Sequence, residues 1–260
     1  MDIRLDGKSA VVTGGSKGLG LAIAKEFASS GADVAIFARD PAALADAKAD
    51  IQKVAKAKVA AVSVDVSKMA PIQAGYDQVI KEFGKVDILV NNAGQSQAHP
   101  ILEVSDEAWQ ADFDLKVFAA LRLVRLCMPQ MIDRKWGRII NVLNIGAKAP
   151  GPRSVPTSVS RAAGLAITKV IAGEGAPHNV LCNALHVGII ISDQIKRRYD
   201  RERPNVSLEE FIAQAGKAVP LGRMGKAEEF AAVATFLCSE QAGYVTGTSI
   251  NVDGGRSPIW

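Results

Sequence analysis

The segment Thr13 to Gly20 is a glycine-rich turn whose spacing suits the binding of a phosphate group. It follows a short apolar run, Ser9–Thr13, and opens a helical pattern. Such a turn brings backbone N–H groups at a helix N-terminus close to a pyrophosphate. We therefore predict a dinucleotide site here, and an ordinary glycine-rich connection is the alternative. The predicted binding residues of the turn are Gly14, Ser16, Lys17, Gly18, Leu19 and Gly20.

Two cations lie where the adenosine ribose of such a ligand would be held. Lys17 is inside the turn, and Arg39 ends the second predicted strand. An arginine there accommodates a ribose 2′-phosphate, whereas a carboxylate would bind a 2′-hydroxyl. Asp40 comes one residue late for that carboxylate role and, before Pro41, is better placed as a helix N-cap. The sequence therefore favours NADP(H) over NAD(H).

Strand and helix patterns that must position these residues alternate along the chain. The predicted strands are Ser9–Thr13, Asp33–Phe37, Val59–Val64, Val86–Val90, Arg138–Leu143, Val180–Leu185 and Ser249–Val252. The predicted helices are Leu19–Phe27, Pro41–Val54, Ile72–Phe83, Asp106–Arg134, Thr157–Gly173 and Lys226–Leu237. The strands are continuous apolar runs, as expected when helices cover both faces of a sheet. The pattern predicts an α/β, doubly wound Rossmann fold with a seven-stranded, mostly parallel sheet.

Length and composition favour one domain over residues 1–260. The chain is 48% hydrophobic, and no linker or repeat divides it. The connection Gly188–Gly225 is far longer than usual and follows a strand end, where such sheets bind ligands. We expect a lid over about 189–225, in which Ser207 and Glu210 have the spacing of a capping box.

The distribution of charge and the positions of the cysteines limit the kinds of ligand and partner that we expect. The net charge of +4 is spread along the chain, and its densest patch, Lys196–Arg203, is interrupted by two acids. That is typical of a solvated helix face and not of a nucleic-acid site. Three distant cysteines in apolar runs indicate reduced core thiols, and no apolar run approaches the ~20 residues of a membrane span. We expect a cytoplasmic protein that binds a small molecule, without nucleic acid, membrane or metal.

Together the motifs resemble those of the short-chain dehydrogenase/reductase family over essentially the whole chain. They are the turn Thr13–Gly20, Asp65-Val66, Asn91-Asn92-Ala93-Gly94, and Gly243-Tyr244-Val245-Thr246-Gly247 through Asp253-Gly254-Gly255. The resemblance implies that Asp65 and Val66 contact adenine. It also implies that Asn92, Ala93 and Gly94 follow the adenosine ribose, and that the segment through Val187, Gly188 and Ile190 to Ser192 approaches the nicotinamide.

The resemblance further implies a homo-oligomer, usually a tetramer, built on two of the predicted helices. These are Asp106–Arg134 and Thr157–Gly173. Their apolar runs, Val117–Leu126 and Ala162–Ala172, suit pairing between copies, although a face buried within one chain explains them equally well.

The chain departs from the family at four positions that usually hold Asn, Ser, Tyr and Lys. By register these are Asp114, Asn144, Thr157 and Arg161. The resemblance implies that the usual tyrosine is the general acid or base and that the lysine holds the nicotinamide ribose. A threonine hydroxyl is far less acidic than a phenol, so the ordinary mechanism is disabled. Among the tyrosines, only Tyr199 in the predicted lid is placed to visit the site.

Two hypotheses address these replacements. Asp114 and Arg161 would form a partly buried ion pair that restores charge balance, and independent drift is the alternative. Arg161 keeps a cation where the ribose hydroxyls should lie. His186 follows strand Val180–Leu185 and is a candidate general acid near neutral pH. A core histidine paired to backbone is the alternative.

Three functions remain open at this point. The first is an NADP(H)-dependent oxidoreductase for a small carbonyl or alcohol, whose atypical acid is His186 or a water held by Asn144 and Thr157. The second is a non-redox enzyme on the same scaffold. The third is an inactive protein that senses the nucleotide, because fold alone does not establish function. The intact glycine turn argues against a cofactor-free lyase or dehalogenase.

Overall fold

A seven-stranded parallel sheet forms the centre of the molecule in the computed structural model, which describes residues 2–202 and 205–260. Its strands are β1 (Ser9–Thr13), β2 (Asp33–Ala38), β3 (Val59–Ser63), β4 (Ile88–Asn91), β6 (Gly137–Asn144), β8 (Val180–Val187) and β9 (Ser249–Val252). They lie in the order β3-β2-β1-β4-β6-β8-β9, and every neighbouring pair is parallel. The predicted Rossmann architecture is confirmed.

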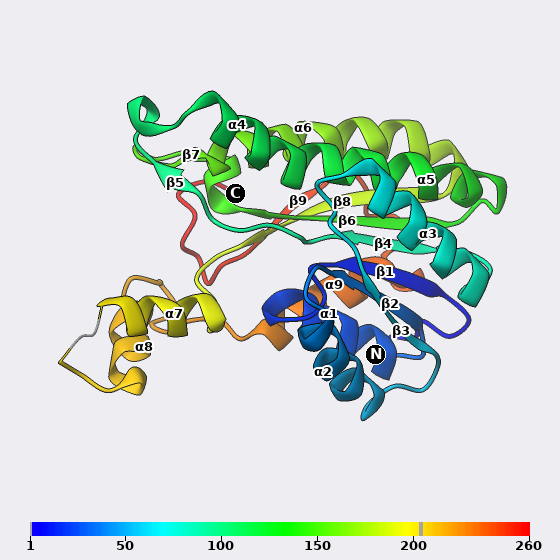
Figure 1. The fold of residues 1–260 in the computed structure, drawn as a ribbon, viewed down its shortest axis with the longest axis horizontal. Coiled ribbons are helices and arrows are strands. Elements are labelled where there is room, and N and C mark those ends of the chain that lie inside the picture. The colour runs from blue at the N-terminus through cyan, green and yellow to red at the C-terminus, as the bar shows by residue number, and fades with distance from the viewer. Residues whose placement is uncertain (1, 203–204) are drawn as a thin grey trace.

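Helices cover both faces of this sheet (Figure 1). One face carries α1 (Gly18–Ser29), α2 (Pro41–Gln52) and α9 (Ala227–Cys238), and the other carries α3 (Met69–Phe83), α5 (Ala119–Asp133) and α6 (Thr157–Gly175). Successive strand residues therefore point into different cores: Val12 packs with Phe27 on the first side, and Val11 packs with Leu123 on the second. This two-sided burial is the reason that the strands are continuous apolar runs.

The helix predicted over Asp106–Arg134 is interrupted. It consists of α4 (Asp106–Phe113), a π-helical turn over Asp114–Phe118, and α5. A π turn inserts one extra residue and shifts which side chains face inward, a device that is frequent at functional sites. Lys116 is buried as a result, although it is a lysine.

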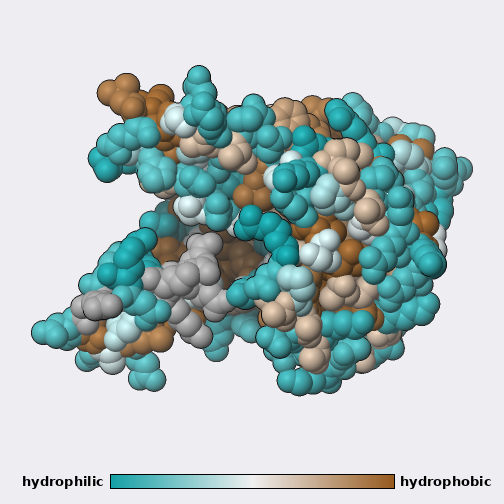
Figure 2. Space-filling model, in the orientation of Figure 1, coloured by the Kyte–Doolittle hydropathy of each residue, from teal (hydrophilic) through white to brown (hydrophobic). Residues whose placement is uncertain are grey.

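The predicted lid lies between β8 and α9 and contains α7 (Asp193–Glu202) and α8 (Leu208–Gly216). The capping box is confirmed, because the Ser207 hydroxyl accepts from the N–H of Glu210 and the Glu210 carboxylate accepts from the N–H of Ser207. The last residue of the predicted basic patch, Arg203, falls outside the described residues. The two helices project from the body (Figure 1), and a hollow separates the lid from it in Figure 2.

A second, two-stranded antiparallel sheet was not predicted. It pairs β5 (Ala98–His99) with β7 (Val155–Pro156), and each strand is too short to leave a pattern in the sequence. The pairing brings Gln97 beside Thr157, whose backbone N–H donates to the Gln97 carbonyl over 3.2 Å. It thus positions the first residue of α6.

The state of the cysteines and the lengths of the helices can be compared with the expected core thiols and the expected lack of a membrane span. Cys127, Cys182 and Cys238 are all buried and free. Burial raises the pKa of the Cys127 thiol to about 12, which keeps it protonated. Over residues 2–202 and 205–260, no helix is long and apolar enough to cross a membrane.

The hydroxyl of Thr13, at the end of β1, forms hydrogen bonds with β4 and the loop after it, at the point where the strand order reverses. It donates to the carbonyl of Val90 over 3.2 Å and accepts from the N–H groups of Asn92, at 2.9 Å, and Ala93, at 3.0 Å. Chain segments leaving β1 and β4 turn to opposite sides here, which opens a crevice at the carboxyl ends of the strands. One buried hydroxyl therefore sets the spacing of the crevice walls.

We expect Thr13→Val to lower the free energy of unfolding by about 1–3 kcal/mol, because it leaves two N–H groups and a carbonyl without their partner. Urea unfolding followed by circular dichroism measures the difference. Thr13→Ser keeps the hydroxyl and is the control. Equal losses in the two variants would contradict the role given to the hydroxyl.

Candidate cofactor and active site

Two adjoining cavities of about 300 and 560 Å³ lie in this crevice and share part of their walls. The smaller lies between the glycine turn and the end of β2, and the larger extends toward α6 and the lid. Every predicted cofactor-binding residue except Gly20 lines one or both. They are Gly14, Ser16, Lys17, Gly18, Leu19, Arg39, Asp65, Val66, Asn92, Ala93, Gly94, Arg161, Val187, Gly188 and Ile190.

Gly20 has a packing role next to the cavities. A Cβ at this position would lie 2.3 Å from the Gly14 carbonyl oxygen and 2.6 Å from Nδ2 of Asn92. Gly14 and Gly18 have φ of +64° and +55°, which side chains rarely adopt. The three glycines thus let α1 begin directly beneath the crevice.

The N-terminus of α1 presents unsatisfied donors to the crevice. Its N-cap is Lys17, whose side chain makes no capping hydrogen bond. The first N–H groups of a helix have no partner within the helix and, with the helix dipole, attract anions. A pyrophosphate fits this end of the cavity.

The smaller cavity carries the two predicted cations at its rim. Lys17 and Arg39 are exposed, and neither forms an ion pair within the described residues. Asp40 is confirmed as a helix cap, because its carboxylate accepts from the N–H groups of Ala42 and Ala43 at 3.0 and 3.3 Å. The Asp40 carboxylate is therefore engaged as a helix cap, which leaves Lys17 and Arg39 available to an anionic ligand.

Asp65 lines the same cavity as Arg39. Its carboxylate accepts hydrogen bonds from the hydroxyl and the N–H of Ser67, at 2.7 and 3.1 Å. These bonds lower the pKa of Asp65 and hold the loop after β3 in a turn.

Three of the predicted catalytic residues meet in the larger cavity: Asn144, Thr157 and Arg161. Nη1 of Arg161 donates to the carbonyl of Val142 over 2.6 Å, and a Cβ on Gly94 would lie 2.6 Å from its Nη2. Burial lowers the pKa of Arg161 to about 10, so it remains charged at neutral pH. Gly94 is thus the residue that allows a cation at this depth.

A buried polar cluster lies directly behind Thr157. Nζ of Lys116 donates to the Thr157 hydroxyl over 2.8 Å and pairs with the carboxylate of Asp112. The other oxygen of Asp112 accepts from the hydroxyl of Ser160 over 2.6 Å. The side chains of Lys116 and Asp112 are each only 1% exposed. Burial lowers the pKa of Lys116, and the attraction of Asp112 opposes that shift.

Lys116, Asp112 and Ser160 are not among the site residues that the sequence predicts. An aspartate and a lysine four residues apart on a predicted helix were a usable signal, because such side chains are neighbours. The π turn that rotates Lys116 toward α6 has no comparable signature in the sequence. The structure brings Lys116, and not the predicted Asp114, into contact with Thr157.

The predicted ion pair between Asp114 and Arg161 is wrong. Asp114 pairs with Arg122 at 3.2 Å and accepts from the amide of Gln110 at 3.0 Å. It does not line either cavity. The π turn begins at Asp114 and directs Lys116, not Asp114, toward Thr157.

His186 does not face the nicotinamide end of the cavity, which contradicts its prediction as a general acid. The ring is fully buried, Nδ1 lies 2.7 Å from the Asn144 carbonyl, and Nε2 lies 2.7 Å from the Ser249 hydroxyl. The carbonyl can only accept, so Nδ1 carries the proton and Nε2 accepts from Ser249. Burial lowers the pKa of His186, which keeps this core histidine neutral.

Tyr199 is held within the lid. Its hydroxyl donates to the carbonyl of Val206 over 3.0 Å, and its ring packs edge-on against Phe211. Neither cavity is lined by Tyr199. Its possible visit to the site stays a prediction that this arrangement does not favour.

Comparisons with known proteins agree with this geometry. Residues 14–257 match the family described as enoyl-(acyl carrier protein) reductase. The chain is 32% identical over 257 residues to 3-oxoacyl-(acyl-carrier-protein) reductase FabG of Chlamydia muridarum, covering 99% of this chain and 100% of that protein. It is 35% identical over 255 residues to 3beta-hydroxysteroid dehydrogenase 1 of Eggerthella lenta, covering 97% and 95%.

The structural likeness extends over the full chain. The crystal structure of L-sorbose reductase from Gluconobacter frateurii, complexed with NADPH and L-sorbose, superposes with a TM-score of 0.95 at 35% identity and covers 100% of both chains. The family match, these relatives and the parallel sheet with a glycine turn after β1 lead to one conclusion. The chain belongs to the short-chain dehydrogenase/reductase family.

Proposed function

We propose that the protein is an NADP(H)-dependent oxidoreductase acting on a small carbonyl or alcohol substrate. The observation that carries this proposal is the continuity of the two cavities, from Arg39 past the N-terminus of α1 to Thr157. The sorbose reductase that it resembles was crystallised with NADPH, which supports the same cofactor class here.

The residues present fit such a cofactor. The free N–H groups at the start of α1 would hold the pyrophosphate, and Lys17 and Arg39 the ribose 2′-phosphate. Arg161 would hold the nicotinamide ribose from the depth of the larger cavity. A bound nicotinamide dinucleotide supplies or accepts a hydride. The chain must supply the binding groups, the proton and the exclusion of water.

The acid and base groups are also proposed to be non-standard. Where the family usually has Ser, Tyr and Lys, this chain has Asn144, Thr157 and Arg161. Lys116, rather than Asp114, is the central-helix residue that reaches this group. Oδ1 of Asn144 is buried without a hydrogen-bond partner among the described residues, and this residue is suited to hold a water or a substrate hydroxyl.

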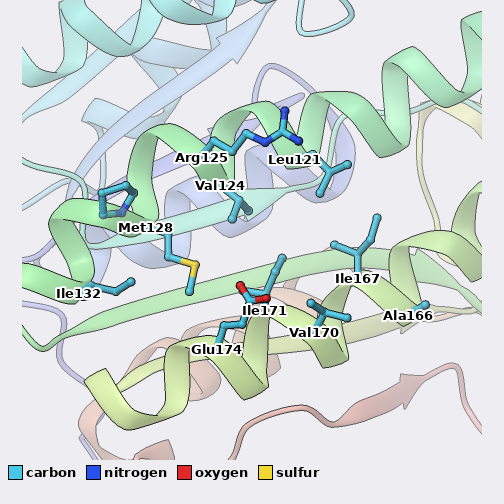
Figure 3. A pocket seen from close by; sticks show the side chains of 11 residues that line it. Leu121, Val124, Arg125, Met128, Ile132, Ala166, Ile167, Val170, Ile171 and Glu174 are labelled. Carbon is cyan, nitrogen blue, oxygen red and sulfur yellow. The ribbon is translucent and has the colours of Figure 1, made fainter.

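A second copy of the chain is the proposed partner, at an apolar groove between α5 and α6. The groove has a volume of about 560 Å³, and Figure 3 shows side chains of both helices facing each other across it. Its lining includes Leu121, Met128 and Val170, and Val170 is 58% exposed. Arg125 and Glu174 at the same groove are opposite in charge, so two copies related by a two-fold axis can match them.

The proposed function is tested by titrating the protein with NADPH and NADP⁺ and then following NADPH absorbance with a panel of aldehydes and ketones. We expect saturable binding and carbonyl-dependent NADPH consumption. Tight binding without turnover would support a nucleotide-sensing protein instead. Absence of binding would contradict the assignment of the cavities.

Arg39→Ala should weaken NADPH binding by about 10–100-fold, because a charge-assisted hydrogen bond contributes about 1.5–3 kcal/mol. Binding of NADH, which lacks the 2′-phosphate, should change little. Isothermal titration calorimetry measures both affinities, and Lys81→Ala, an exposed cation on α3, is the control. Equal losses for the two nucleotides would refute a 2′-phosphate site.

Val170→Asp should shift the protein to smaller species, because an unpaired charge would be buried in an apolar interface. Sedimentation velocity at micromolar protein concentration measures the distribution. Val54→Asp places the same change at another exposed valine, after α2, and should leave the distribution unchanged. A wild type that sediments as a monomer would rule out this interface.

A further inference from the structure

We propose that Lys116 and Thr157 form a two-residue proton relay, in which Thr157 protonates the substrate oxygen and Lys116 replaces the proton on Thr157. The inference rests on the proposed carbonyl reductase function and deepens it. Thr157 is the catalytic residue, because it lines the cavity, and Lys116 acts through it.

The hydrogen bonds of Thr157 fix the direction of its proton. Its oxygen accepts from Nζ of Lys116 and from the N–H of Gln97, both at 2.8 Å. A hydroxyl has two acceptor sites and one donor, so both lone pairs are used and only the O–H remains. No described residue accepts from that O–H, and the side chain lies in the cavity wall. The proton is available to a ligand oxygen.

Lys116 makes the hydroxyl of Thr157 more acidic than an ordinary threonine hydroxyl. A hydroxyl that accepts a hydrogen bond from an ammonium group is more acidic than one in water, because the cation stabilises the developing alkoxide. Burial lowers the pKa of Lys116, while Asp112, its partner on α4, opposes that shift. Arg161, a second cation packed against it from α6, adds to the lowering. The ammonium is thus a better proton donor than an exposed lysine.

Asp112 and Ser160 keep the ammonium aimed at Thr157. The carboxylate binds Lys116 on one oxygen and the Ser160 hydroxyl on the other. Ser160 and Thr157 lie one turn apart on α6, so the cluster locks α4, the π turn and α6 together. The side chain of Lys116 is only 1% exposed, and its ammonium donates directly to the threonine that lines the cavity.

The proton and electron balance is complete. In reduction, a bound NADPH would supply the hydride to the carbonyl carbon, and the electron pair of the C=O π bond would move to the carbonyl oxygen. That oxygen takes the hydroxyl proton of Thr157, Oγ1 takes a proton from Nζ, and Lys116 becomes a neutral amine. Water that enters after the alcohol leaves returns one proton to Lys116 through Thr157. Alcohol oxidation runs the same steps in reverse.

Three other candidate acids are engaged elsewhere. His186 is buried with both ring nitrogens bonded. Arg161 uses Nη1 on the Val142 carbonyl and, with a pKa of about 10, stays charged. Tyr199 is bonded within the lid. The relay is therefore the path by which a buried ionisable group reaches the hydroxyl of Thr157 in the cavity wall.

The first test compares Thr157→Val with Thr157→Ser. We expect Thr157→Val to lower kcat/KM for carbonyl reduction by about 10²–10⁴-fold, the usual contribution of a general acid. Thr157→Ser, which keeps the hydroxyl, should stay within about tenfold of the wild type. Thr235→Val removes a buried hydroxyl in α9 and controls for the loss of packing. Affinity for NADPH should be unchanged in all three.

The second test neutralises the lysine without leaving a buried charge. The double variant Lys116→Gln/Asp112→Asn replaces the ion pair by two amides of similar size. In the wild type, kcat/KM should fall as pH rises through the pKa of Lys116, because reduction needs the protonated acid. This fall of kcat/KM at alkaline pH should disappear in the double variant. At pH values below the pKa of Lys116, kcat/KM of the double variant should be about 10²-fold lower than that of the wild type. Lys53→Gln, at an exposed pair with Asp50, should keep the fall at alkaline pH.

A third readout does not depend on activity. In protein labelled with ¹³C at lysine Cε, the Lys116 signal is the one absent from the double variant. We expect its pKa to lie below that of an ordinary lysine and to fall further in Thr157→Val, which removes a hydrogen bond to the charged form. An ordinary pKa, unchanged in Thr157→Val, would overturn the relay.

These outcomes separate the two proposals. A wild type that consumes NADPH with a carbonyl, together with full activity of Thr157→Val, overturns the relay and leaves the reductase function standing. A wild type that binds NADPH but reduces no carbonyl overturns the function, and the relay with it. Loss of NADPH binding in Thr157→Val would also count against the relay, because the role of Thr157 would then be structural.

Discussion

The close approach of two loops at the carboxyl ends of β1 and β4 is the constraint on which the site depends. Asn92 donates to the backbone carbonyls of Thr13 and Gly14, and the Thr13 hydroxyl binds the chain after β4 in return. Gly20 must lack a side chain for this contact to form. The same contact sets the start of α1 beneath the crevice, so anion binding follows from strand packing.

The second constraint is the burial of an ion pair, Lys116 with Asp112, inside the fold. Burying an ammonium and a carboxylate costs several kcal/mol per ion unless each is paired and hydrogen-bonded. Lys116 and Asp112 meet that requirement through each other and through the hydroxyls of Thr157 and Ser160. A well-packed apolar pair would often be as stable, so stability alone does not explain the ion pair, and the proposed relay gives it a chemical role.

The two constraints meet at Arg161. Gly94, in the loop after β4, leaves room for the guanidinium, and α6 carries both Arg161 and Thr157 on the turn that faces the cavity. The β5–β7 pairing fixes the beginning of α6 through Gln97. A guanidinium and a hydroxyl that accepts from an ammonium are thereby held at neighbouring positions, where the proposed function needs a ribose ligand and a proton donor. Neither depends on a tyrosine or on His186.

The sheet, the glycine turn, the cations Lys17 and Arg39 and the Asp40 cap could all be predicted from the sequence, because they follow from local periodicity and from residues placed at strand ends. Which titratable groups meet depends on long-range packing and could not be predicted in this way. The π turn moved the central position from Asp114 to Lys116, since an inserted residue changes the facing side chain without changing composition. For His186 the structure favours the core histidine over the general acid, and the sequence could not decide between them, because a strand pattern does not reveal which polar atoms of neighbouring strands, here Asn144 and Ser249, bind a side chain.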